Sequence, residues 1–284
     1  MFYFPIIGAI ALATGTILQR AILKKRKISI KLYQSAEFLA ITLALLPFIY
    51  FFWKLDSHAL ELKNIFIFSS VIFFSIIANL FTYYSMKWEK VSNLEPAKML
   101  EPLFVILLAI VFSYIFGEAL FERNIKIIIP ALIAGSALIL AHLKKDHLDI
   151  NNYFIAAILG SFFFALELVI TRLILDFYAP TTFYFLRCAA IFLISFLAFK
   201  PNLKKLDKKL KLQILTVGFI WAIYRVVVYY GFLKLGVIFT TLMLMLGPIF
   251  IYAFAWKFLK EKINWKNIAA SIVIVGCVLY AILN

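Results

Sequence analysis

Ten long apolar runs constrain this chain more than any other feature of its sequence. A helix needs roughly 20 mostly apolar residues to cross the hydrocarbon core of a membrane. The connections between the runs are short, and the runs lack the roughly ten-residue alternation of a membrane β-barrel. We therefore expect an all-α integral membrane protein with transmembrane helices at about residues 2–23, 31–53, 65–86, 92–116, 125–143, 153–176, 181–199, 212–233, 237–258 and 265–283.

The composition excludes most other classes of protein. Apolar residues make up 65% of the 284 residues and charged residues only 15%, with a mean hydropathy of +0.99. Soluble domains are usually about 45–50% apolar and about 25% charged. This rules out a soluble enzyme, a secreted disulfide-rich domain and a disordered tail. The first run has no positively charged segment before it and no small-residue cleavage pattern, and positive charge follows it instead, so we expect a retained span rather than a signal peptide.

The net charge of +15 is concentrated in short basic tracts between the apolar runs, such as residues 24–27 and 204–211. Membrane proteins keep such tracts on the cytoplasmic side, so no nucleic-acid partner is expected. Most Lys and Arg residues fall in the connections after the first, third, fifth, seventh and ninth runs. This asymmetry places both termini on the same side of the cell membrane, outside the cytoplasm.

The sequence offers no residues for enzymatic or cofactor chemistry. Cys188 and Cys277 each lie inside an apolar run and form no CxxC pair, so neither a metal site nor a structural disulfide is indicated. The chain has no P-loop, HExxH, GxSxG or dinucleotide-binding motif. We expect no catalytic residue, no cofactor and no metal.

The two halves of the chain are similar to each other. At an offset of 146 residues, Tyr83 matches Tyr229 and Pro102 matches Pro248, among other pairs. Each half, 1–148 and 149–284, holds five predicted helices, and an odd number inserts the second copy upside down. Inverted repeats of this kind are typical of secondary transporters, which hold their substrate near the midplane between the copies.

The repeated pattern resembles the EamA-like family of the drug/metabolite transporter superfamily. In each half a Pro lies early in the fourth helix, a Glu follows that helix and a Gly lies in the fifth, at Pro102, Glu118 and Gly135 and at Pro248, Glu261 and Gly276. The resemblance implies ten helices around a central cavity lined largely by the first, third, fourth, sixth, eighth and ninth. It also implies homodimer contacts through the fifth and tenth helices, and small metabolites such as amino acids as substrates.

The chain departs from the family pattern in two respects. Relatives are usually described with cytoplasmic termini, opposite to the charge asymmetry above. The basic residue expected early in the second helix of each copy is present as Arg187 in the second copy, whereas the first copy has Gln34, Ser35 and Glu37 nearby.

Charged residues inside the runs are candidates for a substrate site, because a charge in the bilayer normally faces protein, water or a partner. Glu95, Lys98 and Glu101 follow one another at steps of three and share one helical face. They form either a polar stripe on a cavity wall or a structural ion-pair cluster near the interface.

Glu167 and Arg225 are candidates for opposite charges within one cavity, where an amino acid's ammonium and carboxylate would each find a partner. They could equally pair with each other as a buried salt bridge. Arg187 is expected to anchor helix packing or to extend to the membrane surface. Pro102 and Pro248 are expected to kink their helices and to free a backbone carbonyl.

Aromatic and amide side chains complete the predicted substrate-binding set. They could offer a ring face and hydrogen bonds to an amphipathic metabolite. The full set is Asn79, Tyr83, Lys98, Glu101, Glu167, Trp221, Tyr224 and Arg225.

These features predict a secondary transporter that moves a small polar or amphipathic metabolite by alternating access. Glu101 and Glu167 are the candidates for proton coupling, since a low-dielectric cavity favours the neutral carboxyl. A flippase for a lipid-linked substrate and a non-transporting membrane scaffold are the alternatives. A scaffold would not need its buried charges to converge on one hollow.

Overall fold

The computed structural model describes residues 3–25, 28–89, 91–117, 124–142, 151–250 and 265–283. The predictions for Glu118 and Glu261 lie outside these residues, as does the side chain of Glu95. The described chain is all-α and contains α1 (Tyr3–Lys25), α2 (Ile30–Phe52), α3 (Leu62–Trp88), α4 (Val91–Lys98), α5 (Leu100–Phe116), α6 (Ile125–His142), α7 (Asn152–Arg172), α8 (Pro180–Phe199), α9 (Lys208–Leu235), α10 (Val237–Leu244) and α12 (Trp265–Leu283). Short 3₁₀ helices η1 (Ser57–Leu60), η3 (Leu175–Phe177) and η4 (Leu203–Lys205) lie in the connections.

Each of the ten predicted runs is mostly helical where the structure describes it, with breaks at Met99 and Met245. Among the described residues, eight helical segments are long and apolar enough to cross a membrane, and 125–141 and 237–250 are shorter apolar helices. Helices are the expected solution, because the bilayer offers no water to satisfy exposed backbone groups. The chain is therefore a multi-pass membrane protein.

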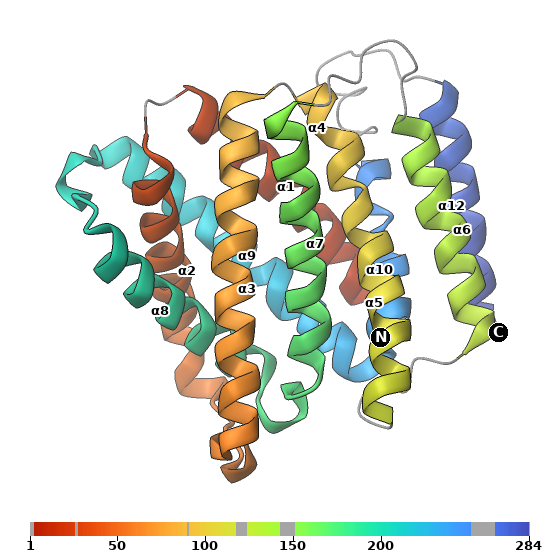
Figure 1. The fold of residues 1–284 in the computed structure, drawn as a ribbon, viewed down its shortest axis with the longest axis horizontal. Helices are drawn as coiled ribbons and strands as arrows, with labels where there is room; N and C mark the ends of the chain where they lie inside the picture. The colour runs from red at the N-terminus through yellow and green to blue at the C-terminus, as the bar shows by residue number, and fades with distance from the viewer. Residues whose placement is uncertain are drawn as a thin grey trace.

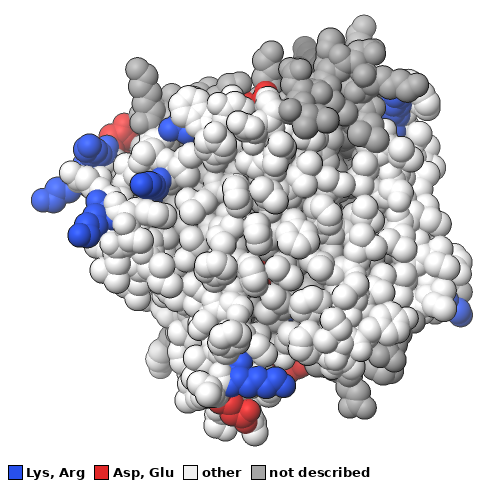
Figure 2. All heavy atoms as spheres, in the orientation of Figure 1, with Lys and Arg blue, Asp and Glu red and all other residues white. Residues whose placement is uncertain are grey.

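The outer surface has the polarity that a bilayer requires. In Figure 2 the charged side chains gather toward the ends of the helices, and a broad band between them is almost free of charge. Large apolar side chains face outward in this protein, including Phe66 at 73% exposure and Leu197 at 70%. Trp53, Trp88 and Trp265 stand at helix ends and are exposed. Those are the positions at which indoles favour the membrane interface.

Local sequence sets the helix boundaries. The side chains of Ser29, Asn151 and Asp207 cap α2, α7 and α9 by accepting hydrogen bonds from backbone N–H groups of the first turn. Pro180 begins α8, where its missing N–H costs nothing. Gly236 adopts a φ of 84° between α9 and α10, a conformation that lets the chain reverse within one residue.

Helices of the first half pack mainly against helices of the second half. The most extensive contacts join α3 with α7, α1 with α9, α2 with α8 and α6 with α12. Figure 1 shows α2 and α8 at one end of the assembly and α6 and α12 at the other. The first helix of each half thus lies along the third helix of the other.

The fourth predicted helix of each half is interrupted just before its proline. The α-helical pattern stops at Met99, between α4 and α5, and again at Met245, after α10. Pro102 and Pro248 each follow three residues later. A proline removes a backbone donor and crowds the preceding turn, which explains why both helices break there. The expected kinks are therefore present at matching positions, 146 residues apart.

Two connections tie α2 to α8. Asp56 N–H donates to the Phe177 carbonyl (2.9 Å) and Ala179 N–H donates to the Lys54 carbonyl (3.0 Å), around an antiparallel bridge between residues 55 and 178. Within the membrane, Gln34 Nε2 donates to Ser195 Oγ (3.1 Å). The pair is thus joined both at one end and along its length.

Close packing of α9 on α2 requires a glycine. A Cβ atom at Gly218 would lie 2.9 Å from backbone atoms of Ala40 and Ile41, so the two helices would have to separate. We expect Gly218→Ala to lower the free energy of unfolding by about 1–3 kcal/mol, as overpacking does, measured by denaturation of the purified protein in detergent.

Gly276 on α12 provides the matched control. Of the atoms that the structure describes, none outside its own helix and immediate chain neighbours lies within 4 Å of a Cβ at this position. Gly276→Ala should leave stability unchanged or raise it by up to about 1 kcal/mol, because alanine favours the helix. Equal effects of the two substitutions would contradict the packing argument.

Candidate functional site

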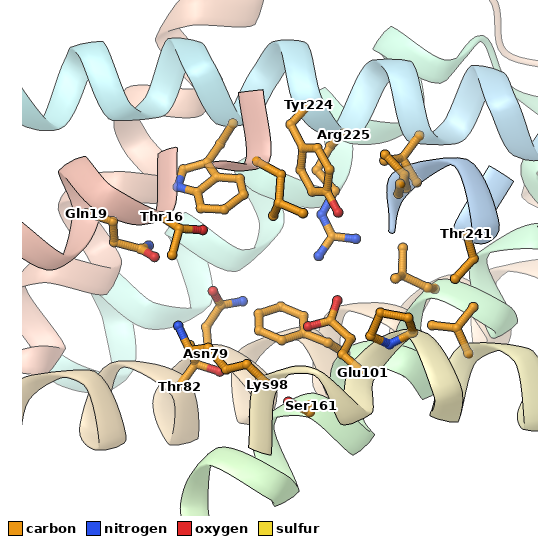
Figure 3. A pocket seen from close by; sticks show the side chains of 18 of the residues that line it. Thr16, Gln19, Asn79, Thr82, Lys98, Glu101, Ser161, Tyr224, Arg225 and Thr241 are labelled. Atoms are coloured by element: carbon orange, nitrogen blue, oxygen red, sulfur yellow. The ribbon is translucent and has the colours of Figure 1, made fainter. Parts of the chain in front are cut away.

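A cavity of about 210 Å³ lies at the centre of the helix assembly. Its walls come from α1, α3, α4, α5, α7, α9 and α10, and also from α2, α6 and α8. Figure 3 shows polar side chains facing the cavity from opposite walls, with Arg225 and Tyr224 on one side and Glu101 and Asn79 on the other. The position and lining agree with the central cavity that the sequence resemblance implies.

The structure brings seven of the eight predicted site residues to this cavity. They are Asn79, Tyr83, Lys98, Glu101, Trp221, Tyr224 and Arg225. Glu167 does not line it. Its buried carboxylate forms ion pairs with Arg187 and Arg225, and these two arginines line the cavity.

Glu167 is held between two arginines. Its carboxylate is 3.1 Å from Arg187 Nη1 and 3.7 Å from Arg225 Nη1, and it accepts a hydrogen bond from the Tyr229 hydroxyl (3.2 Å). Glu167 and Arg225 therefore form the buried ion pair that was one of the two alternatives. Arg225 also lines the cavity, as the other alternative required. One carboxylate between two guanidinium groups leaves a net positive charge at this wall.

Glu101 faces that positive wall from α5. In Figure 3 its carboxylate and the Arg225 guanidinium point toward each other across the cavity. Lys98 lines the same wall as Glu101, one turn earlier. Carboxylate and guanidinium groups separated by an open space provide complementary partners for a small ligand that carries both charges.

Arg187 is more deeply placed than the sequence suggests. It is 2% exposed, so it does not extend to the membrane surface. Nη1 donates to the Tyr229 hydroxyl and Nη2 donates to Ser75 Oγ, both at 2.5 Å. These contacts join α8 to α9 and α3, which fits the expected packing role, and Arg187 also lines the cavity.

Several polar residues that line the cavity were not selected from the sequence, among them Thr16, Gln19 and Glu37. Glu37 is 1% exposed and lies inside an apolar run, a signal as strong as the one that singled out Glu167. Its place as the eighth residue of α2, matching Arg187 in α8, was a further signal. Thr16 and Gln19 give no comparable sequence signal, since uncharged polar residues are common on helices.

Comparison with known protein families gives a match for the second half of the chain. Residues 151–283 match the EamA-like transporter family. Over these residues the chain belongs to that family. EamA-like proteins belong to the drug/metabolite transporter superfamily, and the match implies a membrane transporter of a family whose members are generally non-enzymatic. No curated protein matches the sequence.

A similarity of fold extends over the whole chain. A solved structure titled only "Crystal structure of protein" superimposes with a TM-score of 0.71 at 14% identity, covering 99% of this chain and 97% of that one. At this level of identity the match establishes the arrangement of helices alone. That arrangement extends over both halves, including the residues before the EamA-like match.

Proposed function

We propose that this protein is a secondary transporter that moves a small polar or amphipathic metabolite, such as an amino acid or a related compound, by alternating access coupled to protons. The observation that carries the proposal is the convergence of Glu101, Lys98 and Arg225 on one central cavity. A scaffold protein has no use for ionised groups facing an internal hollow, because each costs free energy in the bilayer.

Alternating access requires two units that exchange conformations, and we propose that these are residues 1–148 and 149–284. The exchanged packing of α1 with α9 and of α3 with α7 supports this division, as do the matching breaks at Met99 and Met245. The breaks lie beside the cavity, where Pro102 and Pro248 are among the lining residues. Interrupted helices at a midplane site are a recurrent feature of inverted-repeat transporters.

The charges of the cavity support a substrate with both an acidic and a basic group. Arg225 would bind a carboxylate, and Glu101 would bind an ammonium or a hydroxyl group. Trp221 and Tyr224, whose rings contact each other edge-on at a centroid distance of 5.5 Å, would cover the apolar part of the substrate. Copies of the protein would associate through α6 and α12, which stand together at one end of the assembly.

The proposal can be tested without knowing the substrate in advance. Purified protein would be screened for thermal stabilisation by a panel of amino acids and related metabolites, because a ligand that binds the folded state raises its melting temperature. Compounds that stabilise it would then be tested for uptake into proteoliposomes with and without an imposed pH gradient. Absence of both stabilisation and flux would refute the proposal, and movement of lipid-linked compounds alone would favour the flippase.

Glu101→Gln should weaken binding of the metabolite found in this screen. Removing the carboxylate that faces Arg225 takes away one of the two charges offered to the ligand, and a loss of about 1.4 kcal/mol corresponds to a tenfold higher Kd. We expect at least about that change, measured by calorimetry. Glu61→Gln, at an exposed position between η1 and α3, is the control and should leave the Kd unchanged.

A further inference from the structure

Glu37 and Arg187 occupy equivalent places in the two halves. Each is the eighth residue of the second helix of its half, α2 or α8. Each side chain is hydrogen-bonded to a tyrosine of the following helix, since Tyr83 donates to Glu37 and Arg187 donates to Tyr229. Tyr83 and Tyr229 themselves match at the repeat offset of 146 residues.

The aromatic packing around these tyrosines is equivalent as well. The ring of Tyr33 meets Tyr83 edge-on at a centroid distance of 5.2 Å, and Phe183 meets Tyr229 in the same way at 5.3 Å. The two halves therefore place a buried charged group in the same setting, but with opposite signs.

The two groups differ in how their charge is balanced. Arg187 has the carboxylate of Glu167 at 3.1 Å. Glu37 accepts hydrogen bonds from Gln19 Nε2 (2.8 Å), from the Tyr33 hydroxyl (3.2 Å) and from Tyr83, all of them uncharged. Among the residues that the structure describes, no Lys, Arg or His nitrogen forms an ion pair with Glu37 within 4 Å.

The side chains that contact the Glu37 carboxylate carry no positive charge. Three uncharged side chains from neighbouring helices interact with it and line the same cavity, Gln19 from α1, Tyr83 from α3 and Trp221 from α9. The cations of the same cavity are Lys98, Arg187 and Arg225, and the two arginines are paired with Glu167. Among the described residues, Glu37 is thus a buried carboxyl group with no cationic partner.

A buried carboxylate without a counter-charge is unfavourable, and the usual remedy is to take up a proton. A bound metal ion would require oxygen ligands with free lone pairs, whereas Gln19 and both tyrosines turn hydrogen atoms toward the carboxylate. A tyrosine hydroxyl can also accept a hydrogen bond. The same neighbours could therefore serve the neutral acid after a hydroxyl group rotates.

We propose that Glu37 binds and releases the proton that is coupled to transport. The proton enters from the aqueous side to which the cavity is open, converts the carboxylate to the neutral acid, and leaves on the other side after the halves exchange conformations. This inference rests on the proposed function. It places proton binding at Glu37 and leaves Glu101 and Arg225 to the substrate.

Infrared difference spectroscopy of the purified protein in lipid tests the proposal with the proton itself as the probe. Lowering the pH should produce a carbonyl band of a protonated carboxyl in the wild type. This component should be absent from Glu37→Gln and present in Glu101→Gln. A band of full intensity in Glu37→Gln would overturn the proposal.

A second variant covers the case in which Glu37→Gln fails to fold. Tyr83→Phe keeps the carboxyl group but removes one of its hydrogen-bond donors, so the band should shift in frequency; an unshifted band would contradict the assignment. These measurements need no substrate, so they fail or succeed independently of the flux experiments. If flux is absent and the band is present, the proposed function fails while Glu37 still binds a proton.

Discussion

Glu167→Gln is expected to destabilise the protein by about 3–5 kcal/mol, the range found when one member of a buried ion pair is removed. The carboxylate is fully buried and lies within 4 Å of two guanidinium groups, so the substitution leaves two positive charges in the bilayer without a counter-ion. Equilibrium unfolding in detergent measures the loss.

Two further variants separate the charge effect from a general sensitivity of the fold. Asp176→Asn removes a carboxylate from an exposed pair with Arg172, and exposed pairs contribute about 1 kcal/mol or less. The double variant Glu167→Gln with Arg225→Gln should recover part of the lost stability, because one uncompensated charge remains in place of two. Strictly additive effects would show that the three side chains do not act as one ion-pair cluster.

Arg225→Gln is expected to weaken binding of carboxylate-bearing metabolites by at least about 30-fold, since losing one partner of a desolvated charge pair costs about 2 kcal/mol or more. The fold should persist, because Glu167 keeps Arg187 as its partner. Calorimetry with the metabolite identified by thermal stabilisation measures the affinity, and proteoliposome uptake measures the flux.

The corresponding control is Arg172→Gln, which makes the same chemical change at the surface end of α7. It should leave the Kd unchanged. An unaltered Kd in Arg225→Gln would show that the substrate carboxylate, if the substrate has one, is bound elsewhere in the cavity.

The helices could be predicted from the sequence because hydropathy is a local property. A run such as residues 31–53 is apolar enough to require the bilayer whatever surrounds it, and α2 is found at Ile30–Phe52. The breaks before Pro102 and Pro248 were predictable for the same reason, since a proline disrupts its own preceding turn. Seven of the predicted site residues line the cavity because charged and aromatic side chains in a membrane helix tend to face protein.

The pairing of the charges was not predictable, because it depends on contacts between distant parts of the chain. Nothing in the neighbourhood of Arg187 indicates that Ser75, 112 residues earlier, accepts a hydrogen bond from it. The choice between a substrate-facing and a paired Glu167 was likewise open until α7, α8 and α9 were placed together. The position of Glu37 inside an apolar run could have singled it out, but its partners, three uncharged donors from three helices, could not be predicted.

The hydrogen bonds that join α2 to α8 have a mechanical consequence. Because α2 and α8 are hydrogen-bonded at one end and again through Gln34 and Ser195, they should move together as one rigid unit. The conformational change that opens and closes the cavity would then take place in the helices on either side of this pair. Spin labels at the exposed residues Leu43 and Leu193 should then keep one separation when the metabolite is added, whereas labels at Ile17 and Ile155 should not. Glu37 and Arg187 lie on α2 and α8, so both side chains would stay in place during transport. The cavity would open first to one side of the membrane and then to the other around these two fixed groups.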